Sequence, residues 1–236
     1  MFNVQCSMVN GQCSMVNGQW SMVFRSFLIA NLILVCGTIR AEVNVIRTDV
    51  NPKTPVFKNE EGVYMLEEGG VYTIRGIVNG DIKGCGDIGV KMEDGTVVNG
   101  CVELLGKRGS VSRKLPRIWI DYTCQATINN PGEVALQAGS HRPTFVEYCG
   151  TLVVNGNVSG ALQLTDGGTT LVVNGDMKDG FAYLDKETWL RVKGTLADGV
   201  MISAEYGHDG DEAPITDTYA TDGDYKVFFG GEEPEE

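Results

Sequence analysis

The stretches TLVVNGNVSGALQL (151–164) and TLVVNGDMKDGFAYL (170–184) open identically and begin nineteen residues apart. A third stretch, beginning at Trp189, aligns with both of them without a gap. The three share columns of apolar residues or glycine: Leu152, Leu171 and Leu190; Val154, Val173 and Val192; Gly156, Gly175 and Gly194; Val158, Met177 and Leu196; Leu162, Phe181 and Val200; Leu164, Tyr183 and Ile202. A fixed period near twenty residues is typical of one supersecondary unit stacked on its neighbours.

The kernel of the repeat is Val, then Asn or Lys, then Gly, with an apolar residue two positions later. It recurs at 78–82 and 98–102. Its glycines are separated by 20, 56, 19 and 19 residues: Gly80, Gly100, Gly156, Gly175 and Gly194. Because 56 is close to three periods, we expect two degenerate rows in that interval, near RIWIDYTC (117–124) and EVALQAGS (133–140). The repeat then predicts about seven rows of 19–20 residues over residues 71–207.

Apolar residues alternate within each row, which is the period of β-strands. One architecture is an all-β parallel solenoid with one row per coil. The alternative is an antiparallel meander or sandwich, in which Asn-Gly forms type I′ hairpin turns. Another glycine follows each kernel after only a few residues, so a return strand would be shorter than the usual five or six residues. Lys193 in the asparagine position also suits a corner better than a hairpin, so the pattern favours the solenoid.

The glycine-punctuated texture of VNGDIKG (78–84) and VNGNVSG (154–160) resembles the coils of bactofilin-type, polymer-forming β-helices. The resemblance covers about residues 71–207. It implies a right-handed parallel β-helix able to associate end to end, with no catalytic residues to carry over. Bactofilins are cytoplasmic, whereas this chain carries an export signal, so the resemblance concerns the fold.

The N-terminus contains two kinds of segment. Residues 1–21 include QCSMVNG at 5–11 and again at 12–18, which we interpret as a tandem-repeat leader read from a mis-assigned start. Residues 22–41 combine Arg25, the apolar run 26–37 and Ala41, the pattern of a cleaved secretory signal peptide. A lipoprotein anchored at Cys36 is the weaker alternative. The sequence therefore predicts an exported protein, periplasmic, at the cell surface or extracellular, without a membrane span in its mature chain.

The net charge and the cysteines limit which partners, cross-links and metals the sequence predicts. The formal net charge is -12, which repels nucleic-acid phosphates, so no nucleic-acid partner is expected. Four cysteines follow the signal peptide: Cys85, Cys101, Cys124 and Cys149. In an exported protein they permit two disulfides, although they suit small buried positions equally well. Their spacings match no zinc pattern.

The segments around the repeat differ from it in composition. Residues 42–70 lack the kernel and are expected to cap the first coil, because an open strand edge recruits other strands. The insert 106–117 is basic, through Lys107, Arg108, Arg113, Lys114 and Arg117, and predicts a solvated loop with an anion or acidic glycan as the alternative ligand. In the acidic segment 208–236, YKVFF (225–229) is apolar enough to form a last strand.

Two sets of carboxylates are candidates for chemistry. Asp209, Asp211, Asp222 and Asp224 are the calcium candidates, but they lack the spacing of an EF-hand loop, which favours a solvated segment. Asp166 and Asp185 share one column of the nineteen-residue alignment. No nucleophile or cofactor motif accompanies either set.

We therefore expect a non-enzymatic structural or adhesive protein without a cofactor, calcium being the one candidate. It would bind a protein or glycan, or associate with itself. A β-helix carbohydrate-active enzyme and a carbohydrate-binding sandwich are the alternatives.

Overall fold

The computed structural model describes residues 8–9, 12–13, 43–107, 114–185, 187–206, 211–214, 219–221 and 225–229, with backbone alone for 8–9, 12–13, 204–206 and the last three ranges. The chain divides into two compact units, Met1–Glu42 and Val43–Glu236. In the first unit, β1 (Met8–Val9) pairs antiparallel with β2 (Gln12–Cys13). Otherwise, the segments predicted as leader and signal peptide lie outside the described residues.

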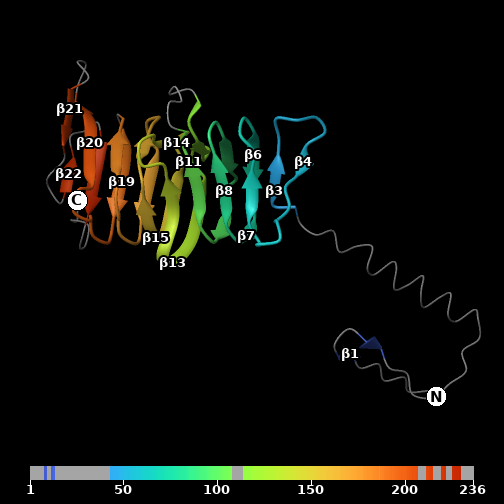
Figure 1. The fold of residues 1–236 in the computed structure, drawn as a ribbon. Coiled ribbons are helices and arrows are strands. Elements are labelled where there is room, and N and C mark those ends of the chain that lie inside the picture. The colour runs from blue at the N-terminus through green and yellow to red at the C-terminus, as the bar shows by residue number, and fades with distance from the viewer. Residues whose placement is uncertain are drawn as a thin grey trace, which may run out of the picture. The chain divides into compact units, whose positions relative to one another are not determined.

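The second unit is all-β, and its strands follow one another in a row (Figure 1). The sheet that carries the kernel, here the kernel sheet, contains β5 (Tyr64–Leu66), β7 (Ile77–Asn79), β8 (Ile82–Cys85), β10 (Val97–Asn99), β11 (Val102–Leu105), β13 (Gln125–Ala138), β15 (Thr151–Ser159), β17 (Thr170–Val173), β19 (Thr188–Val192), β22 (Tyr219–Thr221) and β23 (Tyr225–Phe229). The second sheet contains β3 (Val45–Arg47), β4 (Thr54–Pro55), β6 (Val71–Ile74), β9 (Gly89–Met92), β12 (Arg117–Trp119), β14 (Thr144–Glu147), β16 (Leu162–Leu164), β18 (Phe181–Leu184), β20 (Met201–Tyr206) and β21 (Asp211–Pro214).

Parallel pairing follows the repeat. Leu152 pairs with Leu171, and Leu171 pairs with Leu190, in adjacent parallel strands. Val154 pairs with Val173, while β15 continues through Asn155-Gly156 without turning back. At the earlier kernels, β7 pairs with β10 and β8 with β11, both in parallel. The antiparallel alternative with Asn-Gly hairpins is therefore wrong, and the prediction of parallel stacking is confirmed.

The number of rows differs from the prediction. Val98 pairs with Ile128, and Ile128 pairs with Val154, so one row and not two lies between Gly100 and Gly156. RIW of the first expected row forms β12 in the second sheet, whereas VALQA of the other lies in β13 of the kernel sheet. Both belong to enlarged rows, because the chain adds residues at the basic insert and at a register shift between Asn129 and Val134. Six described rows, starting at β7, β10, β13, β15, β17 and β19, replace the predicted seven.

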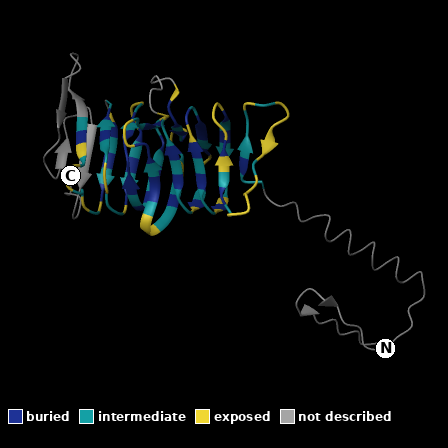
Figure 2. Cartoon of the chain, in the orientation of Figure 1, coloured by how far each residue is buried: buried dark blue, intermediate teal, exposed yellow. Residues whose placement is uncertain are grey.

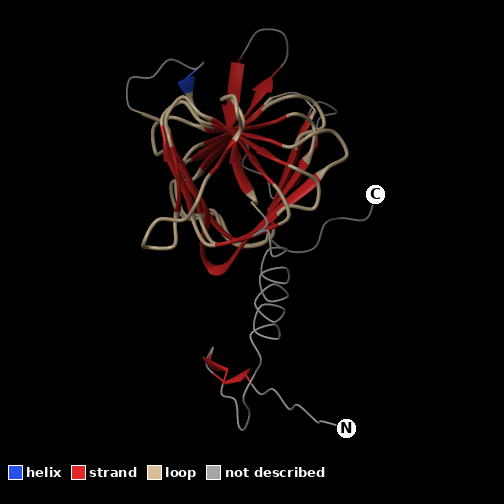
Figure 3. Cartoon of the chain, turned by 90° about the vertical axis from the view of Figure 1, so that its right-hand side faces the viewer, coloured by secondary structure: helices blue, strands red, loops and turns tan. Residues whose placement is uncertain are grey.

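The interior is built from the alternate residues of every strand. Leu152, Val154 and their partners in the next two rows are fully buried, as are Leu162, Leu164 and Leu184. Seen along the row of strands, the strands lie around this common interior (Figure 3), and dark buried positions alternate with lighter ones along them (Figure 2). Each such side chain contributes about 1.5–3 kcal/mol by leaving water, so the Leu152 and Val154 columns form one continuous core. The two predicted columns that aligned Leu162 with Phe181 and Leu164 with Tyr183 are wrong: Leu162 pairs with Ala182 and Leu164 with Leu184, because the row of Phe181 has one more residue before this strand.

The asparagines of the kernel stack into a ladder of side-chain hydrogen bonds. Each Nδ2 donates to the Oδ1 of the asparagine one row earlier: Asn99 to Asn79 at 2.8 Å, Asn129 to Asn99 at 3.3 Å, Asn155 to Asn129 at 2.8 Å, and Asn174 to Asn155 at 2.6 Å. Lys193 occupies the next position, because Val173 pairs with Val192. The asparagine of the kernel is thus a rung of a polar ladder.

The kernel glycines lie where one row crosses close to the backbone of the row before it. A Cβ on Gly175 would lie 2.3 Å from the carbonyl oxygen of Gly156, and one on Gly156 would lie 2.4 Å from that of Asn130. The residue after the glycine then joins the rows, since Oδ1 of Asn157 accepts from the N–H of Asp176 at 3.0 Å. The asparagine, the glycine and the residue after the glycine therefore have separate structural roles in the kernel.

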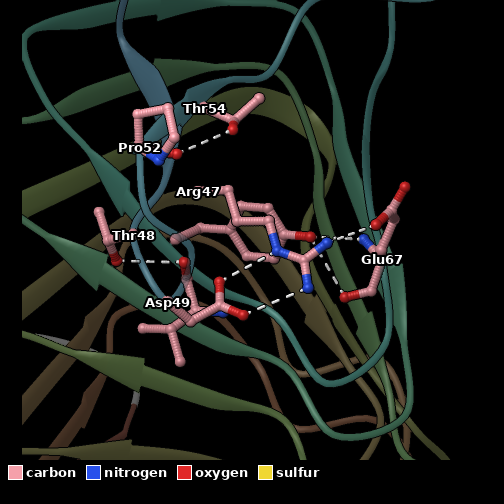
Figure 4. Close-up of polar contacts among 8 residues, drawn as sticks. Arg47, Thr48, Asp49, Pro52, Thr54 and Glu67 are labelled. Atoms are coloured by element: carbon pink, nitrogen blue, oxygen red, sulfur yellow. Dashed lines mark hydrogen bonds and ion pairs between the residues drawn. The ribbon is translucent and has the colours of Figure 1, made fainter.

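Antiparallel strands form three of the four ends of the two sheets, and β5, parallel to β8, forms the fourth. β3 pairs antiparallel with β6, and β4 pairs antiparallel with β3. At the other end, β23 stacks in parallel on β19, as the sequence predicts for YKVFF, and β22 and β21 then pair antiparallel with β23 and β20. Figure 4 shows how Arg47 fastens the first end: its Nε donates to Asp49 Oδ1 at 3.0 Å and its Nη1 to Glu67 Oε2 at 2.5 Å.

Candidate functional site

The outer face of the second sheet carries an aligned column of two aromatic and two polar side chains. Phe145 of β14 pairs with Gln163 of β16, which pairs with Tyr183 of β18, which pairs with Ser203 of β20. Their strand neighbours Val146, Leu164 and Leu184 point into the core and are fully buried. Because side chains alternate along a strand, the members of this column face outward. Phe181 and Met201 form a shorter aligned pair beside it.

These side chains line an open groove of about 770 Å³, here called the aromatic groove. Its lining consists of Leu115, Arg142, Pro143, Phe145, Gln163, Phe181, Tyr183, Met201, Ile202 and Ser203. Met201 leaves 63% of its surface exposed. The groove therefore combines apolar ring surface with a few hydrogen-bonding groups, the usual composition of a small-ligand or glycan site.

One wall of the aromatic groove is fixed by a buried carboxylate. Glu147 is only 7% exposed and accepts hydrogen bonds from Trp119 Nε1, from Arg117 Nη1 at 3.3 Å and from Thr165 Oγ1 at 3.4 Å. The guanidinium of Arg117 lies 4.9 Å from the ring centroid of Phe145. The carboxylate of Glu147 thus balances the charge of Arg117 and helps to hold its guanidinium against Phe145.

A further aromatic pair extends this face. Trp119 and Tyr148 make an edge-to-face contact, with centroids 5.9 Å apart and an interplanar angle of 76°. Tyr148 is 53% exposed and has a positive φ of 80°, so it projects from a turn beyond β14. Exposed ring surface therefore continues beside the aromatic groove.

The positive charges of the basic insert are distributed unevenly. Lys107 pairs with Glu68 and Arg117 pairs with Glu147. Arg142 lines the aromatic groove, and Lys114 is exposed next to the lining residue Leu115. Within the described part of the chain, no ion pair involves Arg142 or Lys114. Arg108 and Arg113 lie outside the described residues.

The predicted calcium candidates are mostly outside the described structure. Asp209, Asp222 and Asp224 lie in undescribed segments, and Asp211 begins β21, where only the backbone is described. Elsewhere in the described ranges, no three His, Cys, Asp or Glu side chains gather as a metal site. The calcium hypothesis for this segment stays a prediction.

The four cysteines predicted as disulfide candidates are free thiols. The rows do not place them opposite one another: Cys85 pairs with Leu105, and the Gln125–Thr151 pair sets Cys124 opposite Gly150. The N–H of Cys101 donates to Asp81 at 2.9 Å, and burial raises the pKa of its thiol to about 11. Burial also raises the pKa of Cys149. Cys101 and Cys149 are therefore protonated near neutral pH and poor nucleophiles.

The expected column of Asp166 and Asp185 is out of register by one residue. Leu164 pairs with Leu184, so the residues that follow them, Thr165 and Asp185, lie opposite each other. Asp166 Oδ2 instead accepts the N–H of Tyr148 at 3.1 Å. The shift arises in the row of Asp185, which has one more residue between Met177 and Ala182 than the preceding row has between Val158 and Leu162, and the carboxylates do not form a stacked pair.

No family model matches the chain, and no curated protein or solved structure matches it. The resemblance to bactofilin-type β-helices therefore rests on the repeat pattern alone. Among the described residues, the structure contains no helix that is long and apolar enough to cross a membrane.

Sequence reasoning from the kernel missed the aromatic groove. A signal was present, because RIW (117–119), TFVEY (144–148) and FAYL (181–184) each place a ring next to a buried aliphatic residue, at a position where a solvated strand would carry a polar residue. The alignment of these strands required the registers of the second sheet, whose rows are offset by 28, 18 and 20 residues at β12–β14, β14–β16 and β16–β18.

Proposed function

We propose that this chain is an exported, right-handed β-solenoid that binds a glycan in the aromatic groove and performs no chemistry on it. The observation that carries the proposal is the groove itself, where Phe145, Phe181 and Tyr183 line an open depression on a flat sheet. Pyranose rings present apolar C–H faces that stack on aromatic rings, while their hydroxyls hydrogen-bond to groups such as Gln163 and Ser203.

The solenoid part of the proposal is supported by the parallel registers, which return the chain to the same sheet position after each row. The right hand follows from the strong preference for right-handed crossovers between parallel strands. Export is supported by the start of the second compact unit at Val43, just beyond the predicted cleavage after Ala41.

Two features favour a binder over the alternatives. None of the described residues that line the aromatic groove is Asp or Glu, and a glycoside hydrolase of the common type needs a carboxylate pair there. The antiparallel strands β4, β21 and β22 form three of the four sheet ends and interrupt the parallel register that end-to-end stacking of coils would continue, while β5 forms the fourth in parallel with β8. We therefore propose a monomeric adhesive protein, not a polymer.

The proposal is tested on a glycan array with the full-length protein and with Tyr183→Ala. Loss of the ring is expected to weaken binding by about threefold to tenfold. Tyr122→Ala is the matched control, because Tyr122 is 74% exposed in a turn and does not line the aromatic groove. Equal binding by wild type and Tyr183→Ala, or silence on the whole array, overturns the proposal. Release of reducing sugar from a bound glycan would favour the enzyme.

A further inference from the structure

We infer that the ligand of the aromatic groove is an acidic polysaccharide, whose carboxylate or sulfate groups contact Arg142. This inference rests on the proposed function and adds the chemical class of the glycan. It is carried by the charges around the groove together with the spacing of its rings.

The charge of the aromatic groove is opposite to that of the protein. The chain as a whole has a formal net charge of -12. The one charged residue among the described lining is Arg142, and the exposed Lys114 adjoins the lining residue Leu115. Asp185 accepts from Gln163 at 3.5 Å, so the positive charge lies at the Leu115 and Arg142 side of the groove. On a protein that is acidic as a whole, this local positive charge favours an anionic ligand at that side.

Arg142 and Arg117 differ in what they can offer such a ligand. Arg117 already faces the carboxylate of Glu147, with Nη1 3.3 Å from each oxygen. Arg142 has no ion pair with a described carboxylate, so its guanidinium can donate two parallel N–H hydrogen bonds to a carboxylate or sulfate. The structure therefore assigns anion recognition to Arg142 and a positioning role to Arg117, which holds the ring of Phe145.

The rings are spaced to follow a polymer. Phe145 and Tyr183 occupy one column two rows apart, with Gln163 between them. Two strand spacings correspond to about 10 Å, and one pyranose ring spans a distance similar to one strand spacing. A chain lying across the strands can therefore stack two of its rings, present a hydroxyl to Gln163 and place an acidic group at the β14 end, where Arg142 lies.

The test is affinity electrophoresis of the full-length protein in polygalacturonate, chondroitin sulfate and dextran, which supply a carboxylate, a sulfate and a neutral control. We expect both acidic polymers to bind at least about tenfold more tightly than dextran, and Arg142→Gln to lose about tenfold of that affinity. Arg142→Lys should recover part of it. Lys53→Gln, the same charge change at an exposed site outside the groove, should leave it unchanged.

The results separate the two proposals. Equal binding of dextran and the acidic polymers, or unchanged affinity in Arg142→Gln, overturns the acidic class while glycan binding stands. Binding of no polysaccharide overturns the proposed function, and this inference with it. Preference for polygalacturonate or for chondroitin sulfate identifies the anionic group. Raising NaCl from about 50 to about 500 mM should weaken wild-type binding more than that of Arg142→Gln.

Discussion

Nδ2 of Asn174 donates a hydrogen bond to Oδ1 of Asn155, 2.6 Å away in the preceding row. Asn155 in turn donates to Asn129 at 2.8 Å, so its amide both gives and receives a bond. The amide planes therefore connect rows that are 19 and 26 residues apart in sequence. The ladder fixes the lateral register of the parallel strands, while apolar burial alone fixes only which face points inward.

Asn155→Ala is expected to lower the free energy of unfolding by about 1–2 kcal/mol, because Nδ2 of Asn174 loses its acceptor and Oδ1 of Asn129 loses its donor. Lys193→Asn should have the opposite sign and add about 0.5–1 kcal/mol by extending the ladder one row. Urea unfolding followed by circular dichroism measures both changes. Lys193→Ala is the control for loss of the lysine itself, and an unchanged midpoint in Asn155→Ala would argue against a stabilising ladder.

Gly175→Ala is expected to destabilise the protein by about 2–3 kcal/mol, since the new Cβ would overlap the Gly156 carbonyl oxygen. Gly199→Ala provides the comparison. Gly199 has a φ of +87° but no atom within 4 Å of the added Cβ, so only backbone strain of about 1 kcal/mol applies. Thermal or urea unfolding of the two variants distinguishes close approach from backbone conformation. Equal losses would contradict the close-approach explanation.

The free energy of unfolding is expected to depend on pH through Asp176, the residue that follows the kernel glycine Gly175. The hydrogen bond from Lys178, and further bonds from Thr195, lower the pKa of Asp176 to about 2. A carboxyl whose pKa is lower in the folded state stabilises the fold above its unfolded pKa, and this contribution is lost as pH falls through the folded pKa. The urea midpoint should therefore decrease between about pH 4 and pH 2.

Asp176→Asn replaces the carboxylate oxygen that accepts from Thr195 with an amide oxygen, which can still accept this bond but cannot titrate. Its urea midpoint should fall less steeply over the same pH interval than that of the wild type. Parallel curves for the two proteins would show that Asp176 does not contribute to the acid dependence.

Glu147→Ala is expected to cost about 2 kcal/mol, because it removes the acceptor of the Trp119 indole and the counter-charge of Arg117. It should also weaken glycan binding, since Phe145 loses the guanidinium that lies over it. Glu103→Gln is the matched control, because its pair with Lys83 is partly exposed and worth at most about 1 kcal/mol. Urea unfolding and the glycan assay report the two effects separately. A loss no larger than that of Glu103→Gln would refute the positioning role of Glu147.

The parts of the fold that sequence reasoning predicted well are those where the period is unbroken. Rows beginning at Thr151, Thr170 and Trp189 have equal lengths, so their pairing follows directly from the alignment of Leu152, Leu171 and Leu190. The row containing Asn129 carries extra residues, and sequence alone does not indicate whether they form a loop or another row. The prediction of two rows in that interval was therefore wrong.

The sequence by itself determined the all-β character, the parallel stacking of the kernel strands and the inner columns of the kernel sheet, because these depend on local alternation and a constant period. It misplaced Phe181 and Tyr183, which the alignment put beside Leu162 and Leu164 but which a one-residue shift turns outward. Only the tertiary structure decided the register across the enlarged rows and the neighbours of Arg142, Phe145 and Tyr183. The aromatic groove joins residues from strands separated by turns of unequal length. Its composition follows from how those turns align the rows, and no short stretch of sequence contains that alignment.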